Sequence, residues 1–269
     1  MSVASLENAS ADVLALAFGQ LCSEAAIPVM EIYASDFEVR YKGDNSPVSA
    51  ADEAAEEVIL AGLKSLLPGV PVIAEESYSR QEADDVGARF LLVDPVDGTR
   101  EFIKRNGEFT INIALVENGV PRAGAVYAPA IKRLFIGGDT AQAFSLDAGE
   151  VIDPAAGERL GGRDRAADGL TAVMSRSHQD DQTLDFLKEL AVMKTVNAGS
   201  SLKFCLLAEG KADVYPRFGP TKEWDVAAGH AVLRAAGGDM TQPCGQAFPY
   251  GKQEDEYLNG AFVAWASAP

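Results

Sequence analysis

The sequence predicts an α/β (α+β) protein in which layered sheets lie between helices. Three observations support this class: apolar helical segments come first, a run of short alternating strands follows, and strands then alternate with helices to the C-terminus. Helices and sheets each bury one apolar face, so elements in this order pack as layers. The 269 residues, 47% of them hydrophobic, suffice for a sizeable core in one large domain or two small ones.

The N-terminal half, about residues 1–150, is expected to begin with two helices. The first covers residues 10–34 and is interrupted or kinked at Pro28, and the second runs from near Ser49 to a stop at Pro68-Gly69. Two short apolar strands and an antiparallel meander with a hairpin turn at Asn118-Gly119 follow. These strands are expected over residues 72–74, 91–93, 110–115, 123–127, 133–136 and 141–144.

The C-terminal half, about residues 165–269, follows a linker-like stretch over residues 157–169 that is rich in Gly, Asp and Arg. Its strands and helices alternate, which is typical of a sheet covered by helices. The expected strands are 170–174, 212–215 and 261–265, and the expected helices are 182–190, 200–209 and 225–236.

The most informative run covers residues 91–116 and reads LLVDPVDGTREFIKRNGEFTINIALV. An apolar strand ends at Asp94, Asp97 follows three residues later, and Gly98 permits a close backbone approach where a helix can begin at Thr99. Two carboxylates at a strand end suit a hard divalent cation, and a helix N-terminus suits a phosphate. An ordinary strand-to-helix turn is the alternative, because Asp, Pro and Gly are common in turns.

Further acids occur at similar places in the chain. Glu75-Glu76 ends a second apolar strand, Asp52 lies early in the helix that begins near Ser49, and Asp225 opens a helix near the C-terminus. Each has a simpler explanation: a solvated surface pair, a capping box with Ser49, and a helix N-cap. As a set, however, carboxylates at strand ends and helix starts, together with Thr99, predict a multinuclear Mg²⁺ site for phosphate ester hydrolysis.

Composition restricts the expected cellular compartment and the expected classes of binding partner. Cys22, Cys205 and Cys244 are odd in number and scattered, which predicts reduced, packed thiols in a cytoplasmic protein. Neither a signal peptide nor an apolar stretch of membrane-spanning length is expected. A net charge of −17 argues against nucleic acid polymers as partners. Small phosphorylated molecules remain candidates, because bound Mg²⁺ would reverse the local sign of the charge.

Several long motifs carry a family resemblance. They are DPVDGTREFIKRNGEFTINIAL, SRSH, and GSSLKFCLLAEGKADVYPR followed by EWDVAAGHAVL. Together they resemble the lithium-sensitive, Mg²⁺-dependent phosphatase superfamily of inositol monophosphatases and fructose-bisphosphatases, and within it the CysQ-type 3′(2′),5′-bisphosphate nucleotidases. The likeness runs from about Lys42 to Gly238. It implies a single phosphatase domain over residues 1–269, folded as an α-β-α-β-α sandwich with a metal site between the two halves.

The resemblance also implies a site for two or three Mg²⁺ ions. Glu75, Asp94 and the carbonyl of Val96 would bind the first ion, and Asp94, Asp97 and Asp225 the second. Thr99 and Asp52 would orient and deprotonate the attacking water. The implied catalytic set is therefore Asp52, Thr99 and Glu75, with the N–H groups of Gly98 and Thr99 holding phosphate oxygens.

A second phosphate distinguishes the implied substrate from those of related phosphatases. By resemblance, His178, Ser200, Lys203 and Arg217 match positions that hold the non-reacting phosphate and ribose of a bisphosphorylated adenosine. Lys42 is placed on a strand-loop near a third metal. For Lys203 a solvated lysine, and for His178 a packed histidine, are the simpler alternatives.

The implied reaction converts 3′-phosphoadenosine 5′-phosphate to AMP and phosphate in sulfate assimilation, with the 5′-phosphosulfate as a further candidate substrate. An inositol or sugar-phosphate phosphatase on the same scaffold is the first alternative. A catalytically silent metal- or phosphate-binding regulator is the second. Formation of a homodimer and peripheral attachment to the cytoplasmic face of the inner membrane are left open.

Overall fold

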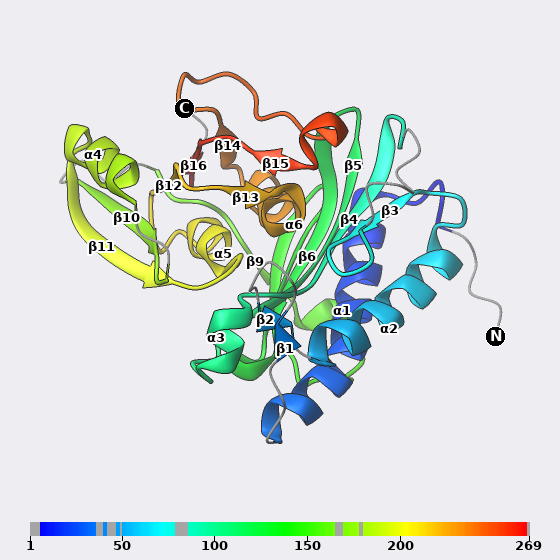
Figure 1. The fold of residues 1–269 in the computed structure, drawn as a ribbon. Coiled ribbons are helices and arrows are strands. Elements are labelled where there is room, and N and C mark those ends of the chain that lie inside the picture. Colours follow the sequence, from blue (N-terminus) through cyan, green and yellow to red (C-terminus); the bar gives the residue numbers. More distant parts are fainter. Residues whose placement is uncertain are drawn as a thin grey trace.

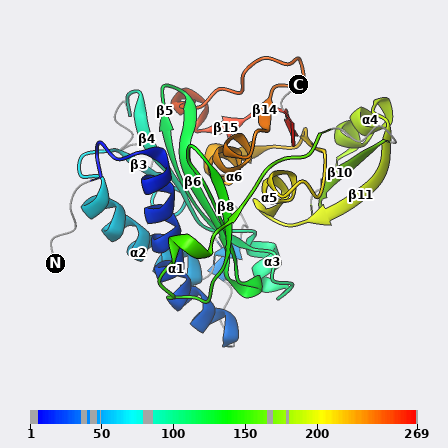
Figure 2. The same ribbon diagram turned by 180° about the vertical axis from the view of Figure 1, so that it is seen from behind.

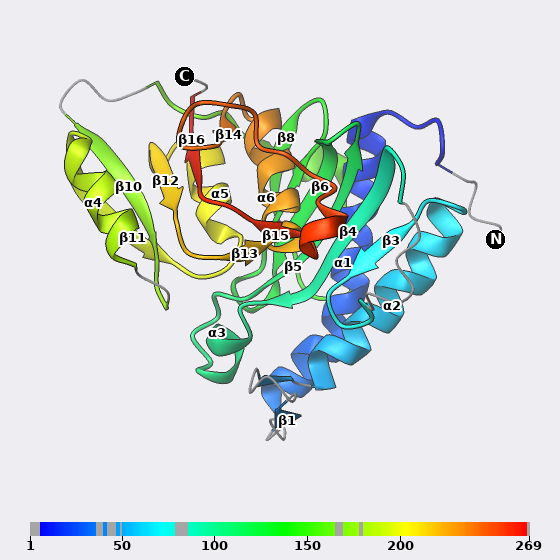
Figure 3. The same cartoon turned by 45° about the horizontal axis from the view of Figure 1, so that its top comes forward.

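Two large sheets and three layers of helices form the main body of the fold (Figure 1). The computed structural model describes residues 6–35, 40–41, 47–48, 50–78, 86–164, 169–177 and 180–267. Viewed with its top turned forward, the molecule shows the layers side by side, from α4 at one edge to α1 and α2 at the other (Figure 3).

A seven-stranded mixed sheet carries α1 (Ala11–Ala34) and α2 (Ala50–Leu66) on one face. Figure 2, which views the molecule from behind, shows α1 lying against this sheet. The strand order is β3-β4-β5-β6-β7-β8-β9. These strands are β3 (Val72–Ala74), β4 (Arg89–Asp97), β5 (Thr110–Glu117), β6 (Val120–Ala128), β7 (Arg133–Gly137), β8 (Ala141–Ser145) and β9 (Glu158–Arg159). The predicted meander is confirmed, whereas β9 falls in the predicted linker.

Helix α1 corrects two expectations. It is continuous from Ala11 to Ala34, so the expected interruption at Pro28 is wrong, while a kink there stays a prediction. Its N-terminus is capped by Ser10, whose Oγ accepts the Val13 N–H at 3.4 Å. The helix is also long and apolar enough to cross a membrane, so the expectation that no such stretch exists is wrong. However, 56% of its most apolar window is buried inside the fold, as in the core helix of a soluble protein.

A five-stranded sheet, in the order β11-β10-β12-β16-β14, forms the other half of the molecule. Helix α4 (Asp181–Glu189) covers its outer face, while α5 (Leu202–Ala208) and α6 (Glu223–Ala235) lie between the two sheets (Figure 1). The strands are β10 (Leu170–Ser175), β11 (Val192–Ala198), β12 (Val214–Arg217), β14 (Asp239–Thr241) and β16 (Phe262–Trp265). Both β11 and β14 lie outside the predicted strands.

Short elements complete the chain. In the described residues, two short strand pairs and three turns of 3₁₀ helix flank the main layers, and α3 (Thr99–Ile103) begins at the residue expected from the sequence. The remaining elements are β1 (Arg40–Tyr41), β2 (Pro47–Val48), β13 (Thr221–Lys222), β15 (Leu258–Asn259), η1 (Pro129–Ile131), η2 (Pro154–Ala156) and η3 (Gln253–Asp255).

Three clusters of buried apolar side chains hold the layers together. The first packs α1 and α2 on the seven-stranded sheet, and the second joins the other face of that sheet to α5, α6 and the five-stranded sheet. The third packs α4 on the five-stranded sheet. This order of layers confirms the α-β-α-β-α sandwich.

Two glycines bring α6 close to the seven-stranded sheet. A Cβ on Gly124 in β6 would lie 2.9 Å from the carbonyl oxygen of Ala228, and a Cβ on Gly137 in β7 would lie 2.7 Å from that of Ala231. Both distances are shorter than real contacts between such atoms. The position of α6, and of every side chain that it carries, therefore depends on the absence of side chains at these two positions.

We expect Gly137→Ala to reduce the free energy of unfolding by roughly 1–3 kcal/mol, because the added methyl overlaps the backbone of α6 in a packed core. Chemical denaturation measures this change. Gly260→Ala is the matched control, since a Cβ there meets none of the described atoms within 4 Å. It should change stability by less than about 0.5 kcal/mol. Equal stability of the two variants would contradict the close approach of α6.

Candidate metal centre

A bulge at the end of β4 turns two acids to the same face of the sheet. Asp94 pairs with Asn112 on β5, but Asp97 pairs with Thr110. The chain therefore advances by three residues on β4 over the stretch in which it advances by two on β5. In a regular strand, residues three apart point to opposite faces. The extra residue restores the same face for Asp94 and Asp97. Pro95 fits in the bulge because it has no N–H to contribute to the ladder.

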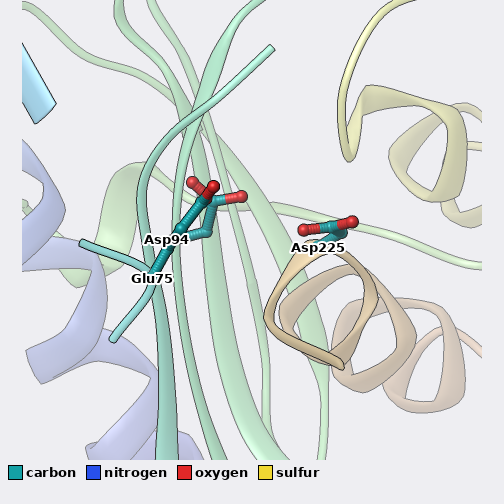
Figure 4. Close-up of side chains that lie close together, drawn as sticks. All are labelled: Glu75, Asp94 and Asp225. Atoms are coloured by element: carbon teal, nitrogen blue, oxygen red, sulfur yellow. The ribbon is translucent and has the colours of Figure 1, made fainter. Parts of the chain in front are cut away.

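Glu75, Asp94 and Asp225 come together from three elements (Figure 4). Glu75 directly follows β3, which runs parallel to β4 with Ala74 beside Val93, so Glu75 lies next to Asp94. Asp225 approaches from the first turn of α6. One carboxylate oxygen from each of the three residues lies within 4.8 Å of the others. This is the convergence of acids that the sequence motifs predict.

The chemistry of this cluster fits a hard divalent cation. Asp94 is only 1% exposed, and its Oδ1 has no hydrogen-bond partner among the described residues. A buried carboxylate without a partner is costly unless a cation or donor compensates it. All the donors offered are oxygens, the ligand type that Mg²⁺ prefers. Val96, whose carbonyl is expected to join them, lies inside the bulge and is buried.

Burial and mutual repulsion shift the ionisation of these acids. Although the Glu75 side chain reaches solvent at one side, desolvation by the surrounding protein, followed by the charges of Asp225, Glu76 and Asp52, raises its pKa to about 8. Burial and the charge of Asp97 raise the pKa of Asp225 to about 7. The pKa of Asp94 lies well above its usual value because of burial and then the charge of Glu75. Glu75, Asp97 and Asp225 thus each disfavour the charge of at least one neighbouring acid, and a bound cation would remove that penalty.

Asp52 belongs to the same electrostatic group. It lies in the first turn of α2, it is 4% exposed, and its charge raises the pKa of both Glu75 and Asp94. One turn later, the carboxylate of Glu56 accepts the N–H of Glu76 at 2.9 Å and so binds α2 to the end of β3. Because Ser49 lies outside the described residues, a capping box between Ser49 and Asp52 stays a prediction.

Asp225 both caps its helix and faces the acids. Helix α6 begins two residues earlier than expected, at Glu223, so Asp225 is the third helical residue and not the N-cap. Its Oδ2 accepts the backbone N–H of Lys222 at 2.8 Å. This bond fixes the side chain in the orientation that brings a carboxylate oxygen to Glu75 and Asp94.

Two residues beside Asp97 have roles that the sequence did not reveal. Asn112 Nδ2 lies 3.5 Å from Asp97 Oδ2 and donates to Ser201 Oγ at 3.2 Å. Ser201 Oγ in turn donates to the carbonyl of Asp225 at 2.7 Å. Burial raises the pKa of Asp97, while Lys203, the Ser201 N–H and Asn112 act in the opposite direction. A polar Asn112 between buried Ile111 and Ile113 is the one signal in the sequence that could have indicated it.

Ser200 and Gly98 form a close contact between the two halves. Ser200 adopts a left-handed backbone conformation with φ of 50°, and its Oγ lies 2.7 Å from the carbonyl of Asp97 and 2.8 Å from that of Glu108. Gly98 has φ of 90°, and a Cβ there would overlap this hydroxyl. The hydroxyl of Ser200 is therefore used to join the loops. Thr99, the first residue of α3, is half-buried beside it.

Lys203 and Arg217 lie next to the acids, although the sequence separates them widely. Lys203 is 7% exposed, so the alternative of a solvated helix lysine is wrong, and its Nζ donates to the carbonyl of Ser200. Burial lowers its pKa to about 8, against the influence of Asp97. Arg217 is 9% exposed, donates from Nε to the carbonyl of Gly219 at 3.2 Å, and lowers the pKa of Asp225.

Lys42 and His178 lie outside the described residues, so their roles stay predictions. The expected site residues that the structure brings together are Asp52, Glu75, Asp94, Val96, Asp97, Gly98, Thr99, Ser200, Lys203, Arg217 and Asp225.

The fold and the site define a layered α/β protein with a carboxylate site for divalent cations. Residues 11–266 match the inositol monophosphatase family, and the chain belongs to that family. Members of this family are metal-dependent phosphatases, generally with Mg²⁺.

Named relatives are more specific. The chain is 45% identical to the 3′(2′),5′-bisphosphate nucleotidase CysQ of Salmonella typhimurium over 90% of this chain and 96% of that protein. It is 44% identical to CysQ of Escherichia coli K12 over the same shares. Among solved structures, CysQ of Bacteroides thetaiotaomicron, a bacterial member of the inositol monophosphatase family, superposes with a TM-score of 0.80 at 38% identity, covering 94% of this chain and 97% of that one. The inositol monophosphatase of Anabaena shares the fold, with a TM-score of 0.71 at 23% identity over 95% of this chain and 91% of that one.

The raised carboxyl pKa values predict a pH dependence for the metal-free protein. Unfolded Asp and Glu titrate near pH 4, so between about pH 4 and 8 the folded protein binds more protons than the unfolded chain. The stabilisation from these groups is therefore complete below pH 4 and is lost as pH rises through the folded pKa values. We expect the melting temperature in EDTA to fall between about pH 5 and 8.5, and Mg²⁺ to raise it more at the higher pH.

Asp225→Asn is the matched variant for this measurement, because it removes one of the repelling charges. Its melting temperature in EDTA should fall less steeply over the same range. A parent protein whose melting curve depends on pH no more than that of Asp225→Asn would contradict the strained state of the cluster.

Proposed function

We propose that this protein is a Mg²⁺-dependent 3′(2′),5′-bisphosphate nucleotidase that converts 3′-phosphoadenosine 5′-phosphate to AMP and phosphate in the cytoplasm, as part of sulfur metabolism. The observation that carries the proposal is that the three acids Glu75, Asp94 and Asp225 lie close to two buried cations. The cations are Lys203 and Arg217. The acids account for a metal-assisted phosphatase. The cations account for a substrate with a second phosphate. The likeness to CysQ proteins supports the same substrate.

The chain offers ligands for two ions around a shared Asp94. Glu75, Asp94 and the carbonyl of Val96 would hold one ion, and Asp94, Asp97 and Asp225 the other. When bound, the metal supplies positive charge that stabilises the phosphate as it reacts and lowers the pKa of a bound water. The hydrogen bonds from Lys222 to Asp225 and from Asn112 to Asp97 keep two of these carboxylates in place before any metal arrives.

Asp52 and Thr99 would handle the attacking water. Asp52 is a buried carboxylate in the same field as Glu75 and Asp94, and in that position it can accept a proton from water. The Thr99 hydroxyl would hold the same water in line with phosphorus. The N–H groups of Gly98 and Thr99, at the start of α3, would donate to phosphate oxygens.

The second phosphate would lie beside Arg217. Its guanidinium suits a phosphate because it can donate two parallel hydrogen bonds. We assign Lys203 a shared role, since it lies between this position and Asp97 and its charge acts on both. Ser200 would shape the pocket through its backbone, and His178 and Lys42 would contact the substrate, as the resemblance implies.

A phosphate-release panel tests the proposal directly. The protein with Mg²⁺ should hydrolyse 3′-phosphoadenosine 5′-phosphate with a kcat/KM well above those for inositol 1-phosphate and fructose 1,6-bisphosphate. Excess EDTA should abolish all turnover, and Asp94→Asn should reduce it by orders of magnitude because an amide has no charge to offer two cations. Preference for inositol 1-phosphate would favour the alternative phosphatase, and full activity in EDTA would refute both.

Arg217→Met separates the two phosphates, because methionine keeps an apolar stem and removes only the charged group. A charge-assisted hydrogen bond contributes roughly 1.5–3 kcal/mol, so kcat/KM for the bisphosphate should fall about 10- to 150-fold. Inositol 1-phosphate should be hydrolysed almost as before. Arg122→Met, at an exposed ion pair with Asp139, is the control for loss of a positive charge. Equal losses on both substrates would assign Arg217 to the metal centre instead.

A further inference from the structure

Three aromatic rings connect the segment that carries Glu75 to the helix that carries Asp225. Tyr78 lies three residues after Glu75, and Trp224 directly precedes Asp225. The ring centroids of Tyr78 and Trp224 are 5.7 Å apart, and those of Tyr78 and Tyr257 are 5.5 Å apart with the rings edge to face. Trp224 and Tyr257 complete the trio at 6.2 Å. The trio therefore bridges the two chain segments whose acids face each other.

On the α6 side the trio is held rigidly. Trp224 and Tyr257 are 5% and 0% exposed, and the N–H of Glu223 donates to the carbonyl of Tyr257 at 2.9 Å. The fully buried carboxylate of Glu223 accepts the N–H groups of Gly251 and Lys252 at 2.8 and 2.9 Å. These bonds join the chain before β15 to the first turn of α6, and Figure 3 shows β15 and α6 in the same region. Two of the three rings therefore belong to one rigid unit with Asp225.

On the Glu75 side the segment has two anchors. Its start is bound to β4 and α2, because the N–H of Glu75 donates to the carbonyl of Val93 at 3.1 Å and the N–H of Glu76 donates to Glu56. At its end, the ring of Tyr78 packs on Trp224 of α6 and on Tyr257. The Tyr78 and Tyr257 hydroxyls are buried and have no hydrogen-bond partner among the described residues, so the rings themselves make the contact.

We infer that Tyr78, resting on Trp224 and Tyr257, is a positioning residue that sets the separation between Glu75 and Asp225 and so determines how well the site binds a small cation. The inference rests on the proposed function, in which both acids hold metal. Mg²⁺ demands near-ideal octahedral geometry with ligands at about 2.0–2.1 Å, whereas Ca²⁺ accepts about 2.3–2.6 Å and irregular geometry. Loosening the trio should therefore weaken Mg²⁺ binding more than Ca²⁺ binding.

Calorimetric titration of the metal-free protein with Mg²⁺ alone, and with Ca²⁺ alone, tests this without relying on activity. We expect Tyr78→Leu to raise the Kd for Mg²⁺ about 10-fold, at the lower end of the range for groups that orient metal ligands. The Kd for Ca²⁺ should change less. Tyr78→Phe keeps the ring and removes only an unpartnered hydroxyl, so it should bind both ions like the parent.

Two further variants test whether loss of any aromatic contact, and not that of Tyr78 in particular, weakens Mg²⁺ binding. Phe186→Leu removes a comparable ring contact, at 5.4 Å from Phe218, and should leave Mg²⁺ affinity unchanged. Tyr257→Phe should also match the parent. A folded Tyr78→Leu that binds Mg²⁺ like the parent, or a loss equal to that of Phe186→Leu, would overturn the inference while leaving the proposed function intact. A parent protein that binds no Mg²⁺ would refute the proposed function as well.

Discussion

The repulsion among carboxylates at the junction of the two sheets is the constraint around which the molecule is organised. Glu75, Asp97 and Asp225 each raise the cost of ionising at least one other acid of the group, so the acids would separate if the chain allowed it. The scaffold prevents this with packing contacts and hydrogen bonds that add no further charge. They are the close contact of α6 with two glycines, the hydrogen bond from the Lys222 N–H to Asp225, and the Asn112–Ser201 hydrogen bond. In such a site the repulsion lowers the stability of the metal-free fold, and binding of a cation relieves it.

The opposing charges are equally organised. Lys203 and Arg217 are buried on the α5 and β12 side, where they lower the pKa of Asp97 and Asp225 respectively. An anion that enters between metal and cations would meet positive charge on both sides, even though the whole chain carries a net charge of −17. The local field at the site is thus independent of the sign of the surface as a whole.

The sequence was most informative where the pattern is periodic and least informative where tertiary structure decides. The strands of the meander follow apolar alternation, and the acids follow motifs with fixed spacing. Strand β11 was missed because it lies at the edge of its sheet with most of its side chains exposed, so it carries little apolar signal. The use of the Ser200 hydroxyl depends on a contact across the two halves, and the burial of Lys203 depends on tertiary packing, neither of which a local pattern encodes. The role of Asp225 at the start of α6 depends on where the helix begins, and helix boundaries are the feature that a sequence pattern predicts least well.

The bulge in β4 has a consequence for how such a chain can change over time. The two acids share a face only while the bulge persists, because a regular pleat over these same residues would place Asp97, three residues after Asp94, on the opposite face. Asp97 would then point toward the apolar layer of α1 and α2, where a carboxylate has no compensating partner. Substitutions between the two acids are therefore constrained by the shape of the backbone as well as by chemistry, and a residue that favours a regular strand there would displace a carboxylate without altering it.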